Sequence, residues 1–298
     1  MITLAEKLLL FKHEQEINVS NGAVEFVSST AMTITPKYTN AGVTLQYSLD
    51  NISWTNIESG TTTPSANTIY FRGSAAGTKS LYNSSSTNNA WVFTGSTNLE
   101  CNGKLDRLLQ GTLGDDNDIL TIHDFCFCYM FNNVTTLIKA PELPATILGM
   151  YCYQNMFQGC IRLQTSPELP ATTLYNYCYY GMFYGCTLLK TTPILPATIL
   201  GMYCYQNMFR SCISLTTVPI LSATTLPNYC YRLMFYGCTG LKLSTTMTGI
   251  YDKAYRIPTA GIGTVGSYSL ADMFSSTGGT FKGTPTINTT YYTENTPV

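Results

Sequence analysis

The chain has 298 residues, of which 45% are apolar and only 11% are charged, and its formal net charge is -1. The apolar fraction can fill ordinary cores in two or three domains and excludes a disordered chain. A net charge this small provides no long-range field, so we expect no nucleic-acid partner. Tyr, Thr, Ser and Asn supply most of the polar groups, which predicts a neutral, hydroxyl-rich surface.

The first segment, residues 1–20, has the pattern of an amphipathic helix. Thr3 followed by Glu6 is a capping-box signature. The apolar residues behind it fall at roughly helical spacing: Leu4, Leu8, Leu9 and Phe11. A helix this short is marginal by itself, so its apolar face should attach to a partner or to a second copy of the chain. The alternative is a local flap on its own neighbouring domain.

The same segment contains no export signal. Its longest apolar run, residues 8–11, is too short for a signal-peptide core or a membrane span. We therefore expect synthesis in the cytoplasm and no membrane insertion. In that compartment the eleven cysteines should be free, buried thiols rather than disulfides.

Residues 21–96 alternate between apolar and polar side chains. The alternation is clearest where Val43, Leu45, Tyr47 and Leu49 are separated by polar residues. Further short strands are predicted around Trp54 and over 68–72 and 90–94. Short strands between Gly, Ser, Thr and Asn clusters predict a small immunoglobulin-like β-sandwich.

A 26-residue repeat occupies the central region, for which we take residues 97–250. Met-Phe pairs mark its units: Met130-Phe131, Met156-Phe157, Met182-Phe183, Met208-Phe209 and Met234-Phe235. A Cys five residues before each Phe and a Leu six residues after it recur in all five units. Recurring apolar positions predict a solenoid, because one such unit cannot bury its own apolar face.

Prolines end each unit and exclude a helix there. They recur in phase as Pro141 and Pro144, Pro167 and Pro170, Pro193 and Pro196, and Pro219. We expect a helical turn around each Met-Phe pair, an extended run toward the first proline, and a parallel sheet where these runs stack. Residues 146–160 and 198–212 are nearly identical, which indicates that pairs of units duplicated together. Residues 251–298 break the phase and predict a β cap.

Tyrosines flank a cysteine in four of the units. If the cysteine points inward on an extended run, both neighbours point outward and form a face for stacking against sugar rings. The predicted ligand-binding residues are Tyr151, Tyr153, Tyr177, Tyr179, Tyr203, Tyr205, Tyr229 and Tyr231. The alternative is that these rings only stack on one another and shield the repeats.

Catalytic and metal chemistry find no support in the sequence. His13 and His123 lie in different segments without a nucleophile beside them, and Cys152 and Cys160 are too far apart for a zinc knuckle. The acidic stretch 115–118 lacks the glycine and the distant Glu of a calcium loop, so we favour a capped helix start there. We therefore expect no enzyme, no cofactor and no metal.

The repeat motif CYxxMFxGCxxLxxxPxLPATxL resembles the BspA-type leucine-rich repeats of gut bacteria and their phages. The segments YSLDNISW, IYFRG and STGGTF resemble modules that accompany such repeats, and LAEKLL resembles the start of such phage proteins. The implied fold is mainly β with short helical turns: an N-terminal helix, an immunoglobulin-like β-sandwich, and a leucine-rich-repeat solenoid with a β cap.

The resemblance implies a non-catalytic phage virion component, a fibre, appendage or capsid decoration, that binds a host-surface glycan or protein. In that setting, residues 1–20 would contact other virion proteins, and the chain would form a homo-oligomer. The alternatives are an adhesin on a bacterial cell surface and a purely structural virion scaffold without a ligand. The absence of an export signal favours the virion.

Overall fold

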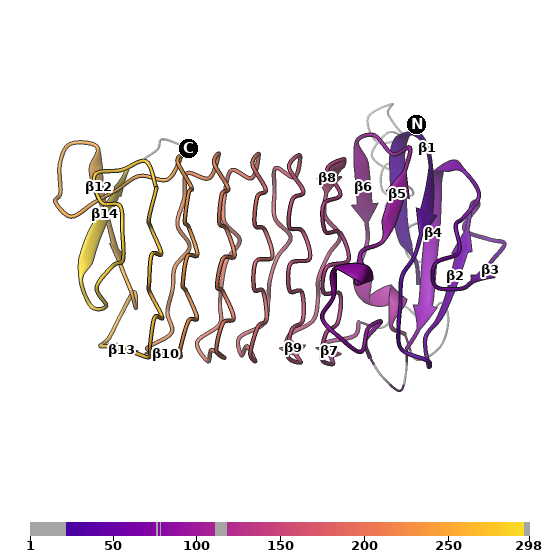
Figure 1. The fold of residues 1–298 in the computed structure, drawn as a ribbon, viewed down its shortest axis with the longest axis horizontal. Coiled ribbons are helices and arrows are strands. Elements are labelled where there is room, and N and C mark those ends of the chain that lie inside the picture. Colours follow the sequence, from indigo (N-terminus) through magenta and orange to yellow (C-terminus); the bar gives the residue numbers. More distant parts are fainter. Residues whose placement is uncertain (1–21, 76, 78, 111–117, 295–298) are drawn as a thin grey trace, which may run out of the picture.

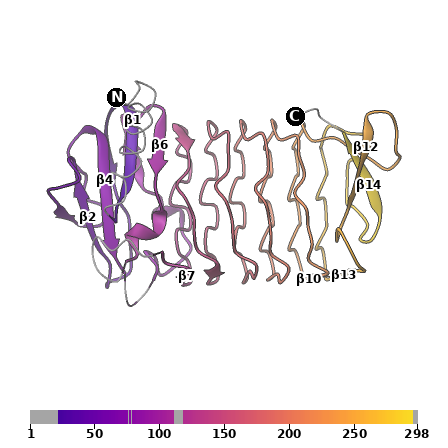
Figure 2. The same ribbon diagram turned by 180° about the vertical axis from the view of Figure 1, so that it is seen from behind.

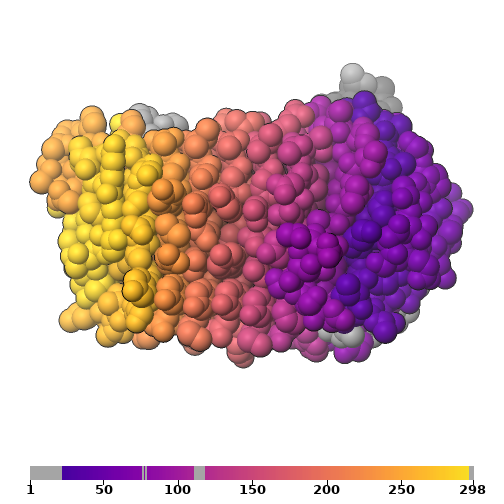
Figure 3. All heavy atoms as spheres, in the orientation of Figure 1, coloured from indigo at the N-terminus to yellow at the C-terminus, as the bar shows by residue number. Residues whose placement is uncertain are grey.

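The computed structural model describes residues 22–75, 77, 79–110 and 118–294. They form an elongated body (Figures 1 and 3). A β-sheet lies at one end, a stack of similar turns in the middle and a small antiparallel sheet at the other end (Figure 1). Within these residues, no helix is long and apolar enough to cross a membrane.

The N-terminal end is one seven-stranded sheet in which the order is β3-β2-β4-β1-β6-β8 and β5 pairs with β1. Its strands are β1 (Val24–Thr35), β2 (Thr44–Ser48), β3 (Thr55–Ile57), β4 (Ala66–Ser74), β5 (Val92–Thr94), β6 (Leu99–Asn102) and β8 (Leu137–Lys139). Strands β2 and β4 fall where the alternating pattern predicted strands. The immunoglobulin-like sandwich is wrong, because the chain makes a single sheet whose open face packs on the repeats: Phe26 lies 6.3 Å from Phe131 between ring centroids.

The predicted fold class is contradicted in its helical and solenoid parts. The described residues contain no α-helix, only the short 3-10 segments η1 (Thr87–Asn89) and η2 (Leu105–Leu108). They are nearly all strand and coil and do not form the leucine-rich-repeat solenoid with helical turns that the sequence predicted. The predicted N-terminal helix with Leu4, Leu8, Leu9 and Phe11 lies outside the described residues.

The segments around the Met-Phe pairs follow a backbone path that is neither helix nor strand. Several residues there are left-handed, for example Tyr151 (φ 62°), Tyr153 (φ 59°) and Asn155 (φ 49°). The N–H of Tyr151 donates to the carbonyl of Asn176 in the next unit at 3.0 Å, and that of Asn155 to the carbonyl of Tyr180 at 2.7 Å. The N–H of Tyr153 donates instead to the carbonyl of Cys126 in the preceding unit at 3.0 Å. The intervening N–H groups bond back three residues, as Gln154 does to Tyr151 at 3.2 Å. We call the resulting stack of units the repeat array.

Buried cysteines join neighbouring units by a second kind of bond. The thiols of Cys160, Cys186, Cys212 and Cys238 each donate to the carbonyl of the Phe 29 residues earlier, at 2.9–3.1 Å. All eleven cysteines are buried and free, as the sequence predicted. Burial raises the pKa of these thiols, to about 12 for Cys238, so they act as hydrogen-bond donors rather than thiolates.

The core of the array is a column of stacked rings. It contains Phe131, Phe157, Phe183, Phe209, Phe235 and Phe274, whose successive centroids lie 5.5–5.6 Å apart. The column continues from the aromatic residues of the N-terminal sheet, because Phe93 stacks on Phe131 at 5.8 Å. A single apolar core therefore runs through the whole described body.

Parallel pairing between units is confined to one edge of the array, low in Figure 1. It consists of β7 (Thr121–Ile122) with β9 (Ile147–Leu148), β10 (Thr225–Leu226) with β13 (Thr264–Val265), and single bridges through Thr173. Most of these pairs follow the prolines, because proline has no N–H to donate. The predicted pairing of the runs that precede the prolines is seen, among the described residues, only where β8 of the first unit pairs in parallel with β6.

The C-terminal end closes the stack with an antiparallel sheet in the order β11-β14-β12. Its strands are β11 (Leu243–Ser244), β12 (Tyr251–Arg256) and β14 (Thr290–Glu294). Strands β12 and β14 lie side by side in Figure 2. The outward N–H groups of the last turn have no further unit to bond. Instead, Asp272 donates to the Thr284 hydroxyl at 2.8 Å and Phe274 to the Gly283 carbonyl at 3.0 Å.

The near identity of units that lie 52 residues apart has a structural cause. The side chains of Asp124, Asn176 and Asn228 accept the N–H of Met150, Met202 and Ser267, respectively, at 2.7–2.8 Å. The residue before each of these donors is a glycine, and a Cβ on Gly201 would overlap the backbone of Tyr175. Alternate units therefore differ because each side-chain acceptor needs a glycine in the unit that follows.

We predict that Gly201→Ala lowers the free energy of unfolding by about 1–3 kcal/mol, the usual cost of forcing atoms into a packed site. Gly249→Ala is the matched control, because a Cβ there meets no atom within 4 Å. Urea denaturation measures both variants. Equal stability of the two variants would show that the close approach of successive units is not as described.

Candidate ligand-binding face

The tyrosine pairs divide into two columns. The first members, Tyr151, Tyr177, Tyr203 and Tyr229, are partly exposed, whereas the second members, Tyr153, Tyr179, Tyr205 and Tyr231, are each 1% exposed. The prediction that both members point outward is therefore wrong for the second. It applied the two-residue alternation of a strand to a backbone that is not extended there, since the first tyrosine of each pair is left-handed.

The partly exposed rings form one continuous outer column. It contains Phe125, Tyr151, Tyr177, Tyr203, Tyr229 and Tyr268, with successive centroids 4.6–5.3 Å apart and planes within 19° of parallel. Each tyrosine ring between the two ends of this outer column has both faces covered by its neighbours, so its edge and its hydroxyl face the solvent. Tyr268, which is 64% exposed, is the last ring of the column toward the C-terminus.

The buried rings form an inner column that begins at Phe127 and continues through Tyr153, Tyr179, Tyr205 and Tyr231 at 5.6–6.0 Å. Among the described residues, the hydroxyls of Tyr179, Tyr205 and Tyr231 have no hydrogen-bond partner. Burial raises the pKa of these three phenols well above its usual range. The inner column is therefore a packing element that no ligand can reach.

Further polar and aromatic side chains lie beside the outer column. Tyr180 contacts Tyr177 at 6.0 Å between centroids, and the Arg232 guanidinium lies 5.7 Å from the Tyr229 ring. Arg210 lies between Tyr184 and Tyr236, at 5.4 and 4.8 Å from their centroids. These residues were not predicted, although the sequence shows that Tyr180 and Arg232 occupy one position of the 26-residue repeat and Tyr184, Arg210 and Tyr236 occupy another. We call them, together with the outer column, the tyrosine face.

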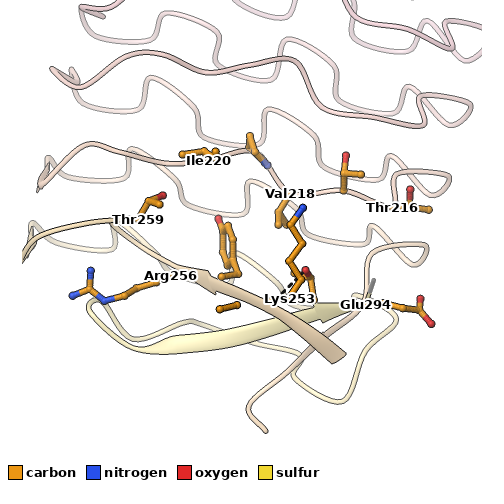
Figure 4. Close-up of a pocket in the computed structure, with 12 residues that line it drawn as sticks. Thr216, Val218, Ile220, Lys253, Arg256, Thr259 and Glu294 are labelled. Carbon is orange, nitrogen blue, oxygen red and sulfur yellow. Dashed lines mark hydrogen bonds between the residues drawn. The ribbon is translucent and has the colours of Figure 1, made fainter. Parts of the chain in front are cut away.

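A separate cavity of about 260 Å³ lies where the C-terminal sheet meets the array (Figure 4). Lys253 of β12 extends across it toward the segment Thr216–Ile220, and Arg256 and Glu294 point away. Glu294 is held by Lys242 at 2.9 Å, and Arg256 donates to the Pro258 carbonyl at 2.7 Å. The cavity is smaller than about 300 Å³, the lower end for small-molecule sites, and it holds no carboxylate pair.

The described residues that could serve metal or acid-base chemistry do not gather in one site. Among residues 22–294, outside the gaps, no group of three or more His, Cys, Asp or Glu side chains could hold a metal ion. His123 is exposed, and His13, Asp115 and Asp116 lie outside the described parts. Asp118 contacts Lys104 at 2.8 Å, and this hydrogen bond lowers the pKa of the Asp118 carboxyl.

No family model matches this chain, and a search of curated proteins and of solved structures likewise gives no match. The resemblance to BspA-type repeats therefore stays a prediction from the motif. Any functional proposal must rest on the surface that the repeats build.

We predict that Tyr205→Phe raises the free energy of unfolding by about 1 kcal/mol, because it removes a buried hydroxyl without a partner and leaves the ring in its column. Tyr203→Phe, in the same unit but on the outer column, should leave stability within about 0.5 kcal/mol of the parent. Urea denaturation compares the two variants. A clear loss of stability in Tyr205→Phe would mean that its hydroxyl is bonded.

Proposed function

We propose that this chain is a non-catalytic phage virion component that presents the tyrosine face to a hydroxyl-rich glycan on the host surface. The observation that supports a binding role is the outer column itself, which adds one aromatic ring per unit from Phe125 to Tyr268. Between Cys126 and Cys238 only seven residues are charged, so the surface around the column suits a largely uncharged ligand.

Hydrogen bonding, rather than ring stacking, is the chemistry that this column offers. Because neighbouring rings cover each other's faces, a sugar meets ring edges and hydroxyls along Tyr151, Tyr177, Tyr203 and Tyr229. These groups repeat every 4.6–4.8 Å between centroids and are held in place by the stack. Groups fixed before binding lose little conformational entropy, which favours affinity.

The place on a virion rests on the repeat motif and the flanking segments, as in the sequence argument. Attachment through Leu4, Leu8, Leu9 and Phe11, and assembly into a homo-oligomer, belong to the same proposal. A bacterial surface adhesin would use the same tyrosine face. Under that alternative the tyrosine face would be displayed on a bacterial cell instead of a virion, and its binding chemistry would be the same.

A purely structural role is the second candidate function, and one observation favours it. The rings of the outer column stack face to face on one another, as they would in an array that only provides length and rigidity. Under this alternative the tyrosine hydroxyls are dispensable.

The test is a triple variant that keeps every ring and removes three outer hydroxyls: Tyr177→Phe, Tyr203→Phe and Tyr229→Phe. We expect at least tenfold weaker binding to host cells or purified host-surface glycans, about 1.4 kcal/mol. The control carries the same change at buried Tyr179, Tyr205 and Tyr231 and should bind like the parent. Undiminished binding by the first variant, with folding verified by its melting curve, would leave the structural role as the better account.

A further inference from the structure

Arg210 is a flat cation held between two rings of the tyrosine face. Three residues before it, the side-chain amide of Asn207 donates at 3.2 Å to the hydroxyl of Tyr180, which contacts Tyr177 of the outer column. The guanidinium carbon of Arg210 lies 5.4 Å from the centroid of Tyr184 in the preceding unit and 4.8 Å from that of Tyr236 in the following unit. Both distances are within cation-π range. Two aromatic rings therefore fix the orientation of this side chain before any ligand arrives.

No acidic side chain of the described residues forms an ion pair with Arg210 or with Arg232. Among the described residues, the basic partners of the ion pairs are Lys104, Arg107 and Lys242. Between Cys126 and Cys238 the only carboxylates are Glu142 and Glu168, which line a hollow among the prolines. The two guanidiniums of the tyrosine face thus keep their full positive charge.

Buried polar atoms without partners gather in the same unit as Arg210. They are Arg210 Nε, Gln206 Oε1 and Asn207 Oδ1, with Gln206 and Asn207 only 7% and 8% exposed. Such atoms cost about 1–3 kcal/mol each and are uncommon in folded proteins. Their gathering within five residues marks this unit as one whose polar groups are not arranged for stability alone.

We infer that the glycan bound by the tyrosine face carries an anionic group, a carboxylate or a sulfate, that Arg210 and Arg232 hold. This inference rests on the proposed function and adds the charge of the ligand to it. A guanidinium binds either anion through two parallel N–H···O bonds, and its weak hydration suits a site among rings. Between Cys126 and Cys238 only five residues are basic, and no two occupy the same position of the repeat, which suits one acidic sugar rather than the phosphate backbone of a nucleic acid.

The experiment measures binding of the full chain to three immobilised glycans with the same neutral core: unmodified, capped with a carboxylate sugar, and sulfated. The parent protein should bind at least one acidic form at least tenfold more tightly than the neutral form. Raising the salt concentration should reduce this preference. Whichever acidic form is preferred identifies the anion.

The decisive variant is Arg210→Gln, with Arg162→Gln as the matched control, because Arg162 is an exposed arginine of the array without a ring contact. Arg210→Gln should reduce the preference for the acidic glycan at least tenfold, whereas Arg162→Gln should keep it. Arg210→Lys keeps the charge without the planar fork and should retain only part of the preference.

Two results would overturn the inference while leaving the proposed function in place: equal binding of neutral and acidic glycans by the parent, or an equal loss of preference in Arg162→Gln. Absence of binding to all three glycans would overturn the proposed function together with the inference. Melting curves of the variants show whether a loss of binding reflects unfolding.

Discussion

The hydrogen bond from a left-handed residue to the next unit is the interaction on which the repeat array depends. Tyr151, Asn155 and Gly159 each donate their N–H to the unit that follows, at 2.7–3.0 Å. A left-handed conformation costs a residue other than glycine about 1 kcal/mol, so the path is stable only when these bonds are made. Each unit therefore needs a neighbour on both sides, and the two terminal sheets supply the missing partners.

Because the units stack in register, the side chains at one position of the repeat form one column along the array. Phe side chains at one position build the core, Tyr side chains at another build the outer column, and Cys side chains donate to carbonyls of the preceding unit. Where a position varies, the surface varies along the array: Tyr184, Arg210 and Tyr236 occupy one column and form a cation between two rings. A chain with few charges can thus place a specific charged group on an otherwise neutral face.

The period, the buried thiols and several strands of the N-terminal sheet follow from apolar spacing and could be predicted from the sequence. The backbone path could not, because Tyr151 and Tyr153 have no intrinsic preference for left-handed values and acquire them only through bonds to neighbouring units. That path replaces the expected helical turns and buries Tyr153, Tyr179, Tyr205 and Tyr231. The single sheet escaped prediction for a related reason: its open face is covered by Phe131 and Met130 of the first unit rather than by a second sheet.

Amide hydrogen exchange tests the bonding between units most directly. The account predicts that the N–H groups of Tyr151, Asn155 and Tyr177 exchange only on global unfolding, although the side chains of Tyr151 and Tyr177 are partly exposed, because each N–H is bonded to the next unit at 2.7–3.0 Å. Rapid exchange at these three amides in the native protein, with slow exchange in β1 and β4, would contradict it.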